Sequence, residues 1–287
     1  MKVFVLGIDG LEYELVEKFD LENLKQLEYG KVSIPKECFI IAPARGPRLR
    51  DTLQPYTPLV WSTLLTGKTP SQTNINKVNF IKWDNRLLQF LRENSGRIGL
   101  NRVKGKTKLL KALGFKRRYH NKDDFRVKTI FDFAKNPIDI SVPCYSKDWK
   151  FKLKADKNDV RGFFEESLSD FKVMREETLR RVTESWDLFF SYTRHLDISG
   201  HLFFGRRIKM WENYALVDEL AGQIKDRLRK GTLLLIVSDH GMNQLENTTL
   251  GKHGEYAYYS GNMSLGLKAP SITDFYEIIK EKLSSDQ

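Results

Sequence analysis

The residues best suited to chemistry are carboxylates and imidazoles that follow expected strands. They are Asp9, Asp197, His201, Asp239, His240 and His253. Zinc and manganese take ligands of these types from proteins. Each residue alone has an ordinary alternative, since Asp–Gly pairs are common in turns and a single histidine often only packs. Because three acid-bearing strand ends and three of the five histidines fall in this set, the pattern favours a metal centre.

Thr57 is the candidate nucleophile. Pro58 suits the first position of a helix, so we expect Thr57 to be the N-cap of a helix over 58–65 that Gly67 closes. Capping alone would explain the residue. A hydroxyl at a helix N-terminus nevertheless lies where backbone N–H groups favour a phosphate. Two metal ions there could lower the pKa of the hydroxyl and bind the attacking and non-bridging oxygens.

The elements that must position these residues alternate between strand and helix. Strands are expected at 3–8, 138–142, 187–192 and 233–237. Helices are expected at 11–27 in two pieces, and at 58–65, 128–135, 159–185, 209–229 and 272–283, while 32–42 should be extended and 43–55 a loop. This alternation predicts an α/β fold with helices on both faces of a central, mostly parallel sheet. Sites in such sheets form at the carboxyl ends of the strands.

Composition narrows the class of protein. With 287 residues, of which 40% are hydrophobic and 30% charged, the chain is expected to fold as a domain rather than to be disordered. Two cysteines, Cys38 and Cys144, make neither a disulfide framework nor a metal-binding pair. We find neither an apolar run long enough to span a membrane nor a signal peptide, so we expect a cytoplasmic protein without a membrane span.

The net charge of +11 is concentrated in one segment. Residues 85–118 include eleven basic residues and a single acidic residue, Glu93. We interpret 82–127 as a basic insertion, which is either a solvated segment or a surface for nucleic acid or another polyanion. Arg45 and Arg48 precede Thr57 and suit phosphate binding, although a solvated loop explains them equally. His120 is expected at the surface. His195, two residues before Asp197, is expected in a packing or surface role, with orientation of a metal ligand as the alternative.

The candidate residues lie in ordered motifs that span residues 9 to 254. These are Asp9, Thr57–Gly67, Asp197-Ile-Ser-Gly-His201, Ser238-Asp239-His240-Gly241-Met242 and His253-Gly254. In this order they resemble the alkaline phosphatase superfamily, and most closely its type I phosphodiesterase/nucleotide pyrophosphatase family. The resemblance implies one alkaline-phosphatase-like, three-layer α/β domain over 1–287, with 82–127 inserted in it.

The resemblance also implies two divalent metal ions. Asp197, His201 and His253 would hold one ion. Asp9, Asp239 and His240 would hold the other, with Thr57 also bound to it and attacking phosphorus. Zinc is the expected metal and manganese the alternative, because both accept these ligands. The phosphate-binding asparagine of the family aligns with Val78, so the neighbouring Asn79 is our candidate for that contact.

The function implied is hydrolysis of a phosphodiester or phosphoanhydride in a nucleotide-type small molecule. One alternative within the superfamily is a phosphotransferase or phosphomutase, which passes the phosphoryl group to an alcohol. An alternative of another class is a polyanion- or nucleic-acid-binding protein that uses the basic insertion. Nucleic acid is therefore a candidate partner alongside the small-molecule substrate.

Overall fold

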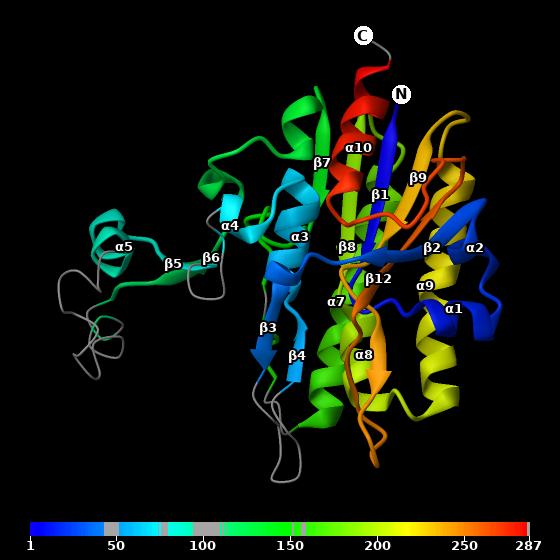
Figure 1. The fold of residues 1–287 in the computed structure, drawn as a ribbon, viewed down its shortest axis with the longest axis horizontal. Coiled ribbons are helices and arrows are strands. Elements are labelled where there is room, and N and C mark those ends of the chain that lie inside the picture. Colours follow the sequence, from blue (N-terminus) through cyan, green and yellow to red (C-terminus); the bar gives the residue numbers. More distant parts are fainter. Residues whose placement is uncertain are drawn as a thin grey trace.

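A six-stranded sheet forms the centre of the computed structural model (Figure 1). The structure describes residues 1–42, 52–73, 75, 80–93, 110, 112, 114–150, 152–155 and 159–285. In spatial order the strands are β2 (Glu28–Ser33), β12 (Tyr256–Gly261), β9 (Leu233–Val237), β1 (Val3–Ile8), β8 (Leu188–Thr193) and β7 (Pro137–Ile140). Strand β12 runs antiparallel to both β2 and β9, whereas β9, β1, β8 and β7 pair in parallel, so the expected mostly parallel sheet is confirmed.

Strand β1 is apolar on both faces because it lies in the middle of the sheet. Val3 and Val5 pack on one side, and Phe4 and Leu6 pack on the other. This double burial explains the continuous apolar run in the sequence. Val3 stands opposite Leu188 of β8 and Leu233 of β9, so all three strands end at the same edge.

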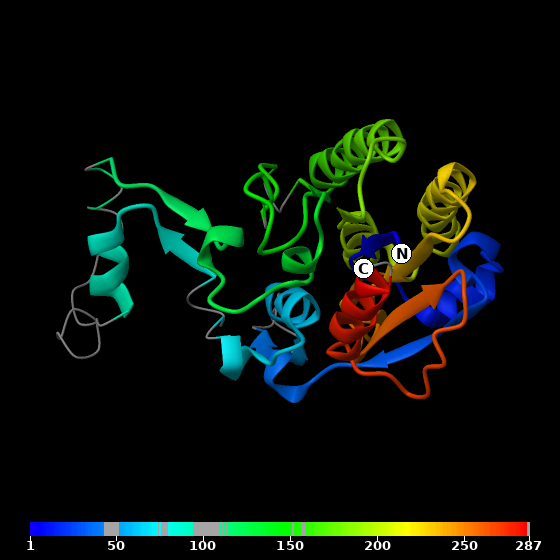
Figure 2. The same ribbon diagram turned by 90° about the horizontal axis from the view of Figure 1, so that it is seen from above.

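Helices cover both faces of the sheet, as Figure 2 shows. The first face packs against α3 (Thr57–Thr66) and α10 (Asp274–Ser284). The second face packs against α1 (Tyr13–Phe19), α2 (Glu22–Lys25), α7 (Val160–Arg181), α8 (His195–Phe203) and α9 (Arg207–Arg227). The expected three-layer α/β architecture is therefore confirmed.

Several local expectations were wrong. Residues 32–42 are not continuously extended, because a 3₁₀ turn at Lys36–Cys38 separates β2 from β3 (Phe39–Ala42). Of the expected loop 43–55, residues 52–55 form β4 (Thr52–Pro55), which pairs with β3. The expected helix 128–135 is one 3₁₀ turn, Ile130–Phe133, since a capping box between Thr129 and Asp132 closes a single turn.

The remaining short elements connect these layers. Strands β10 (Met242–Gln244) and β11 (Gly251–His253) form a hairpin before β12. Helix α4 (Pro70–Thr73) follows α3, and a further 3₁₀ turn covers Lys122–Asp124. No helix in the described ranges is long and apolar enough to cross a membrane.

The described parts of 82–127 lie to one side of the central sheet (Figure 1). Strands β5 (Ile81–Trp83) and β6 (Arg117–Tyr119) pair only with each other within the described chain, and α5 (Arg86–Glu93) follows β5. Arg118 donates to both carboxylate oxygens of Asp124, and the Lys82 ammonium lies 3.2 Å from the same group. Part of the basic charge is thus compensated locally, and the bounds of the insertion stay a prediction.

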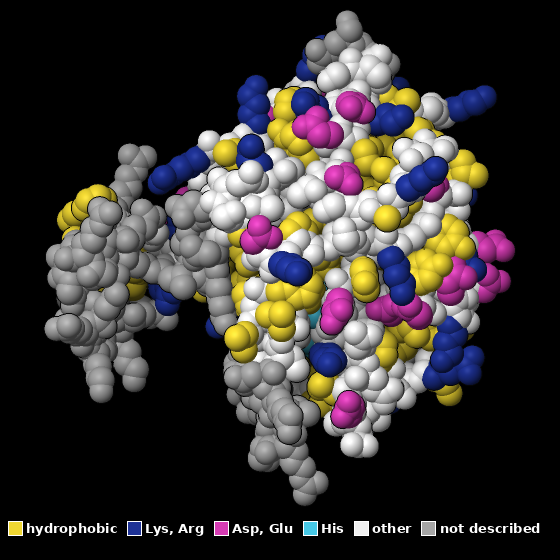
Figure 3. Space-filling model, in the orientation of Figure 1, with side chains coloured by type: hydrophobic (Ala, Val, Ile, Leu, Met, Phe, Trp, Pro, Cys, Tyr) yellow, Lys and Arg dark blue, Asp and Glu magenta, His cyan; other side chains and the backbone are white. Residues whose placement is uncertain are grey.

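The face of the molecule in Figure 3 carries both signs of charge. Lys and Arg side chains are interspersed with Asp and Glu over the helices and strands of the central body. The described part of this face therefore does not show the net charge as one continuous basic patch.

Candidate metal centre

Three adjacent strands deliver the candidate ligands to one edge of the sheet. Asp9 directly follows β1, and Asp239 follows β9 by two residues. The Asp9 N–H donates to the carbonyl of Thr193 at the end of β8, at 2.9 Å. Helix α8 begins two residues after β8 and carries Asp197. Parallel pairing in register therefore brings residues almost 200 positions apart in the sequence to one place.

The first group consists of Asp9, Asp239 and His240, and its side chains are at most 4% exposed. His240 Nε2 lies 3.2 Å from Asp9 Oδ1 and 3.4 Å from Asp239 Oδ2. The other ring nitrogen, Nδ1, lies 2.9 Å from the carbonyl of Gly241. Because a carbonyl accepts only, Nδ1 carries the hydrogen, and Nε2 is the ring atom that faces the two carboxylates.

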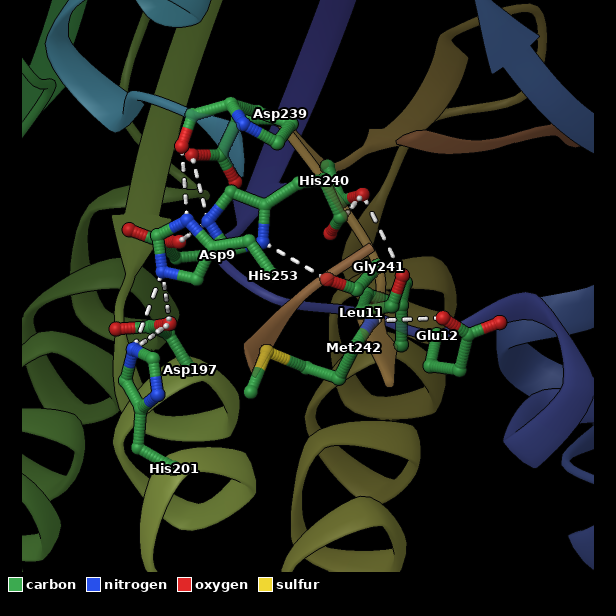
Figure 4. Close-up of polar contacts among 12 residues, drawn as sticks. Asp9, Leu11, Glu12, Asp197, His201, Asp239, His240, Gly241, Met242 and His253 are labelled. Atoms are coloured by element: carbon green, nitrogen blue, oxygen red, sulfur yellow. Dashed lines mark hydrogen bonds and ion pairs between the residues drawn. The ribbon is translucent and has the colours of Figure 1, made fainter. Parts of the chain in front are cut away.

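The second group consists of Asp197, His201 and His253, whose side chains are 12–21% exposed. Asp197 and His201 lie one turn apart on α8, and His253 ends β11. Asp197 Oδ1 lies 3.2 Å from His201 Nε2 and 3.3 Å from His253 Nε2. The two Nε2 atoms are 3.1 Å apart. In the close-up of Figure 4, Asp197, His201 and His253 point toward one another.

Backbone carbonyls also set the tautomers of these two histidines. His201 Nδ1 lies 3.0 Å from the carbonyl of Gly251, and His253 Nδ1 lies 2.9 Å from the carbonyl of Pro55. With hydrogen on both Nδ1 atoms, the two Nε2 atoms and a carboxylate oxygen of Asp197 lie close to one point. A shared cation is the physical arrangement that makes this convergence favourable.

The two groups are neighbours. The rings of His240 and His253 stack with centroids 3.7 Å apart. Ligand atoms of Asp9, Asp197 and His240 also lie within 4.8 Å of one another, although they come from both groups. This spacing suits two ions at the separation found in two-metal enzymes, about 3.5–4 Å.

Buried atoms without hydrogen-bond partners support the fit to metal. Among the described residues, Asp9 Oδ1, Asp197 Oδ1, both carboxylate oxygens of Asp239 and His240 Nε2 are buried without such a partner. An unpaired buried polar atom costs about 1–3 kcal/mol, and more when it is charged. Because all five atoms are ordinary ligands of zinc or manganese, the residues present fit two divalent cations.

The electrostatics of the site reflect closely packed negative charge. Burial opposes the charged form of His240, yet the carboxylates of Asp239 and Asp9 raise its pKa to about 10. Burial and the charge of Asp9 raise the pKa of Asp239 well above its usual range. Burial and the positive charge of His240 lower the pKa of His253 to about 4, so its imidazole is neutral at pH 7. The crowded carboxylates of the first group therefore favour bound protons, and a cation bound there would take their place.

Thr57 is buried, 6% exposed, in the first turn of α3. The helix begins at Thr57 itself with Tyr56 as N-cap, so the expectation that Thr57 is the N-cap was wrong by one residue. The carbonyl of Pro55, two residues earlier, is the hydrogen-bond partner of His253. The chain that leads into α3 is therefore fastened to the second group.

The other site candidates have different outcomes. Arg45, Arg48 and Asn79 lie outside the described residues. His195 is buried between Ser167 Oγ at 3.2 Å and Asn213 Oδ1 at 2.7 Å, which fits the packing role expected for it. His120 was expected at the surface but is 3% exposed, because its Nδ1 faces the carbonyl of Cys144 at 3.1 Å.

Glu12 is a residue of the site that sequence reasoning missed. Its Oε2 accepts a hydrogen bond from the N–H of Met242 at 2.7 Å. The same oxygen would lie only 2.2 Å from a Cβ added to Gly241, so a glycine there leaves room for the Glu12 carboxylate. Glu12 therefore joins the turn after β1 to the turn that carries His240. Burial and the neighbouring Glu14 side chain raise the pKa of Glu12 to about 8.

Comparison with known proteins assigns the chain to the family that its motifs resemble. A family model described as type I phosphodiesterase / nucleotide pyrophosphatase matches residues 3–278, almost the whole chain. The chain belongs to this family. Membership indicates an enzyme that acts on phosphoesters, in a family that is typically metal-dependent.

Individual similarities are more distant. GPI ethanolamine phosphate transferase 3 of Eremothecium gossypii is 30% identical over 108 residues, which are 38% of this chain and 10% of that protein. The PH0037 protein of Pyrococcus horikoshii has a TM-score of 0.49 at 11% identity, covering 98% of this chain and 96% of that one. Murine ectonucleotide pyrophosphatase/phosphodiesterase 5 has a TM-score of 0.46 at 15% identity, covering 86% of this chain and 59% of that one. The chain thus spans only a tenth of the length of the transferase.

Proposed function

We propose that this protein is a metal-dependent phosphodiesterase or nucleotide pyrophosphatase that uses Thr57 as nucleophile and two divalent cations. The observation that carries the proposal is the convergence of two ligand groups whose buried oxygens and ring nitrogen have no hydrogen-bond partner among the described residues. Family membership supports the reaction class. Zinc is the expected ion and manganese the alternative.

Each group would hold one ion. Asp197, His201 and His253 would bind the first, and Asp9, Asp239 and His240 would bind the second together with Thr57. When bound, the ions would stabilise the charge that develops on the phosphate and lower the pKa of the attacking hydroxyl. His253, whose imidazole is neutral at pH 7, could bind through Nε2 without losing a proton first, whereas a cation would displace the proton that the raised pKa of His240 retains.

Thr57 performs the displacement. Its Oγ1 forms a bond to phosphorus, the hydroxyl loses its proton, and the bond from phosphorus to the leaving-group oxygen breaks. The leaving oxygen departs with the bonding electrons and takes up a proton. The backbone N–H groups of the first turn of α3 favour the negatively charged phosphoryl group at this position.

Water completes the cycle. It attacks phosphorus of the phosphothreonine, and its oxygen remains in the phosphate product while a proton returns to Thr57 Oγ1. A diester therefore gives an alcohol and a monoester. Asn79, Arg45 and Arg48 stay candidate contacts to the phosphate of the substrate.

The test is hydrolysis of a p-nitrophenyl nucleotide diester beside p-nitrophenyl phosphate, with zinc or manganese added. We expect faster turnover of the diester, loss of activity on chelation and recovery when the metal is restored. Asp239→Ala serves as the blank, because it removes one ligand from a single group. Preference for the monoester, or equal turnover by Asp239→Ala, would contradict the proposal.

A phosphotransferase is the second candidate, favoured by the similarity over 108 residues to a protein named as a phosphate transferase. The two candidates differ in what attacks the phosphothreonine. An alcohol acceptor added to the diester assay would yield a new phosphodiester or phosphate ester if the protein is a transferase, and only the hydrolysis product if water is the acceptor.

A further inference from the structure

The two carboxylate oxygens of Asp9 have different surroundings. Oδ2 accepts a hydrogen bond from the hydroxyl of Tyr192 at 2.5 Å. Oδ1 is buried without a hydrogen-bond partner and lies 3.2 Å from His240 Nε2. Only one oxygen of this carboxylate is therefore turned toward the other ligands of the first group.

Tyr192 is itself held in place. It lies near the end of β8 beside Gly7 of β1, and it is 5% exposed. The ring of Trp61 packs edge-on against it, with centroids 5.4 Å apart and planes at 85°. A Cβ on Gly7 would lie 2.8 Å from the Phe190 ring and 3.0 Å from the Trp61 ring, so glycine leaves room for these rings against β1.

Trp61 connects Tyr192 to the nucleophile. It lies four residues after Thr57 in α3, so both side chains lie on the same face of that helix. One continuous path of contacts thus runs from the helix that carries Thr57, through Trp61 and Tyr192, to Asp9.

We propose that Tyr192 is a positioning residue of the metal centre: its hydrogen bond to Asp9 Oδ2 leaves Oδ1 as the atom with which Asp9 binds the cation of the first group. This inference rests on the proposed function, since it concerns the ligands of a proposed ion. Outer hydrogen bonds of this kind orient ligands, and their loss typically weakens metal binding by about 10–100-fold.

The test variant is Tyr192→Phe, which retains the ring that Trp61 packs against and removes only the hydroxyl. Tyr258→Phe is the matched control. Tyr258 is also fully buried in the central sheet, and its hydroxyl donates to the carbonyl of Leu24 at 2.8 Å, a group outside the metal centre. Both variants lose one buried tyrosine hydrogen bond, so a general loss of stability affects them alike.

The readout is zinc affinity of the metal-free protein, measured by competition with a chelator of known affinity, without any substrate. We expect Tyr192→Phe to bind one of two zinc ions about 10–100-fold more weakly, and Tyr258→Phe to bind both as the unmodified protein does. In an Asp9→Ala background, Tyr192→Phe should cause no further loss, because the oriented carboxylate is gone.

Three results would overturn the inference. Tyr192→Phe could bind both ions as tightly as the unmodified protein, or it could lose no more affinity than Tyr258→Phe. A further loss in the Asp9→Ala background would also contradict it. An unmodified protein that binds no zinc or manganese at all would instead contradict the proposed function, so the two failures are distinguishable.

Discussion

All three candidate ligand histidines use Nδ1 in the same way. His201, His240 and His253 each direct Nδ1 toward a backbone carbonyl, at 2.9–3.0 Å. Because the partner is backbone rather than side chain, the tautomer is set by the fold itself. Nε2 is left as the candidate ligand atom in every case, and metal-binding histidines commonly have the same arrangement.

Substitutions of Thr57 test the catalytic step separately from metal binding. Thr57→Ala should lower kcat for the diester by about 10³-fold or more, because the covalent step is lost. Zinc content should stay unchanged, since three protein ligands remain in each group. Thr57→Ser keeps a hydroxyl and should retain measurable turnover. Comparable kcat values for Thr57→Ala and the unmodified protein would exclude Thr57 as nucleophile.

At the scale of elements, α8 and the turn after β1 approach each other very closely. Gly10 has a φ of +72°, and a Cβ there would lie 2.7 Å from Asp197 Cα and 2.9 Å from Asp197 N. The atoms met are backbone, so they cannot rotate away. The absence of a side chain at Gly10 therefore permits Asp9 and Asp197 to approach as closely as the proposed pair of ions requires.

Gly10→Ala should therefore weaken zinc binding and destabilise the fold. Gly231→Ala is the matched control, because Gly231 has a φ of +84° with no atom within 4 Å of an added Cβ. Gly231→Ala should lower the unfolding free energy by about 1–2 kcal/mol, because its only penalty is the strain of a side chain on a left-handed backbone. Gly10→Ala should cost more in chemical denaturation. Equal losses and unchanged zinc affinity would contradict this account of the contact.

Some elements could be predicted from the sequence and others could not. Strands β1 and β9 are apolar on both faces, so their sequences alone indicated them. Helix α8 was missed, because Ser199 and Gly200 are typical of a loop. A Cβ at Gly200 would lie 2.7 Å from the Met242 side chain, so the glycine serves tertiary packing that local propensity does not reveal.

At the scale of the whole molecule, the motifs of the candidate ligands could be recognised in the sequence, but the register in which the strands pair could not. Tyr192 donates to Asp9 only because β8 pairs with β1 in parallel, which no local pattern encodes. Glu12 was missed for the same reason, since its partner Met242 is 230 residues away in the sequence. Long-range pairing thus decides which polar residues support the ligands.

Buried neutral histidines outside the metal centre should make stability depend on pH. Burial lowers the pKa of His120 from 6.5 to about 4. The unfolded chain therefore binds more protons than the folded one between pH 6.5 and 4, so the unfolding free energy falls as the pH falls through that range. The loss from this residue approaches about 3 kcal/mol at pH 4.

His120→Asn removes this titration and retains an N–H donor for the Cys144 carbonyl. We expect its unfolding free energy, measured by urea denaturation in the presence of chelator, to fall less steeply between pH 6.5 and 4 than that of the unmodified protein. Parallel pH profiles for the two proteins would show that His120 does not contribute to acid destabilisation.

The central claim is that two separate ligand groups each hold one divalent ion. The most direct measurement is zinc bound per chain after equilibrium dialysis, determined by elemental mass spectrometry. We predict two ions for the unmodified protein and for the control His120→Asn, and one ion each for Asp239→Ala and His201→Ala, which alter different groups. A single ion in the unmodified protein, or two ions retained by both ligand variants, would contradict the account.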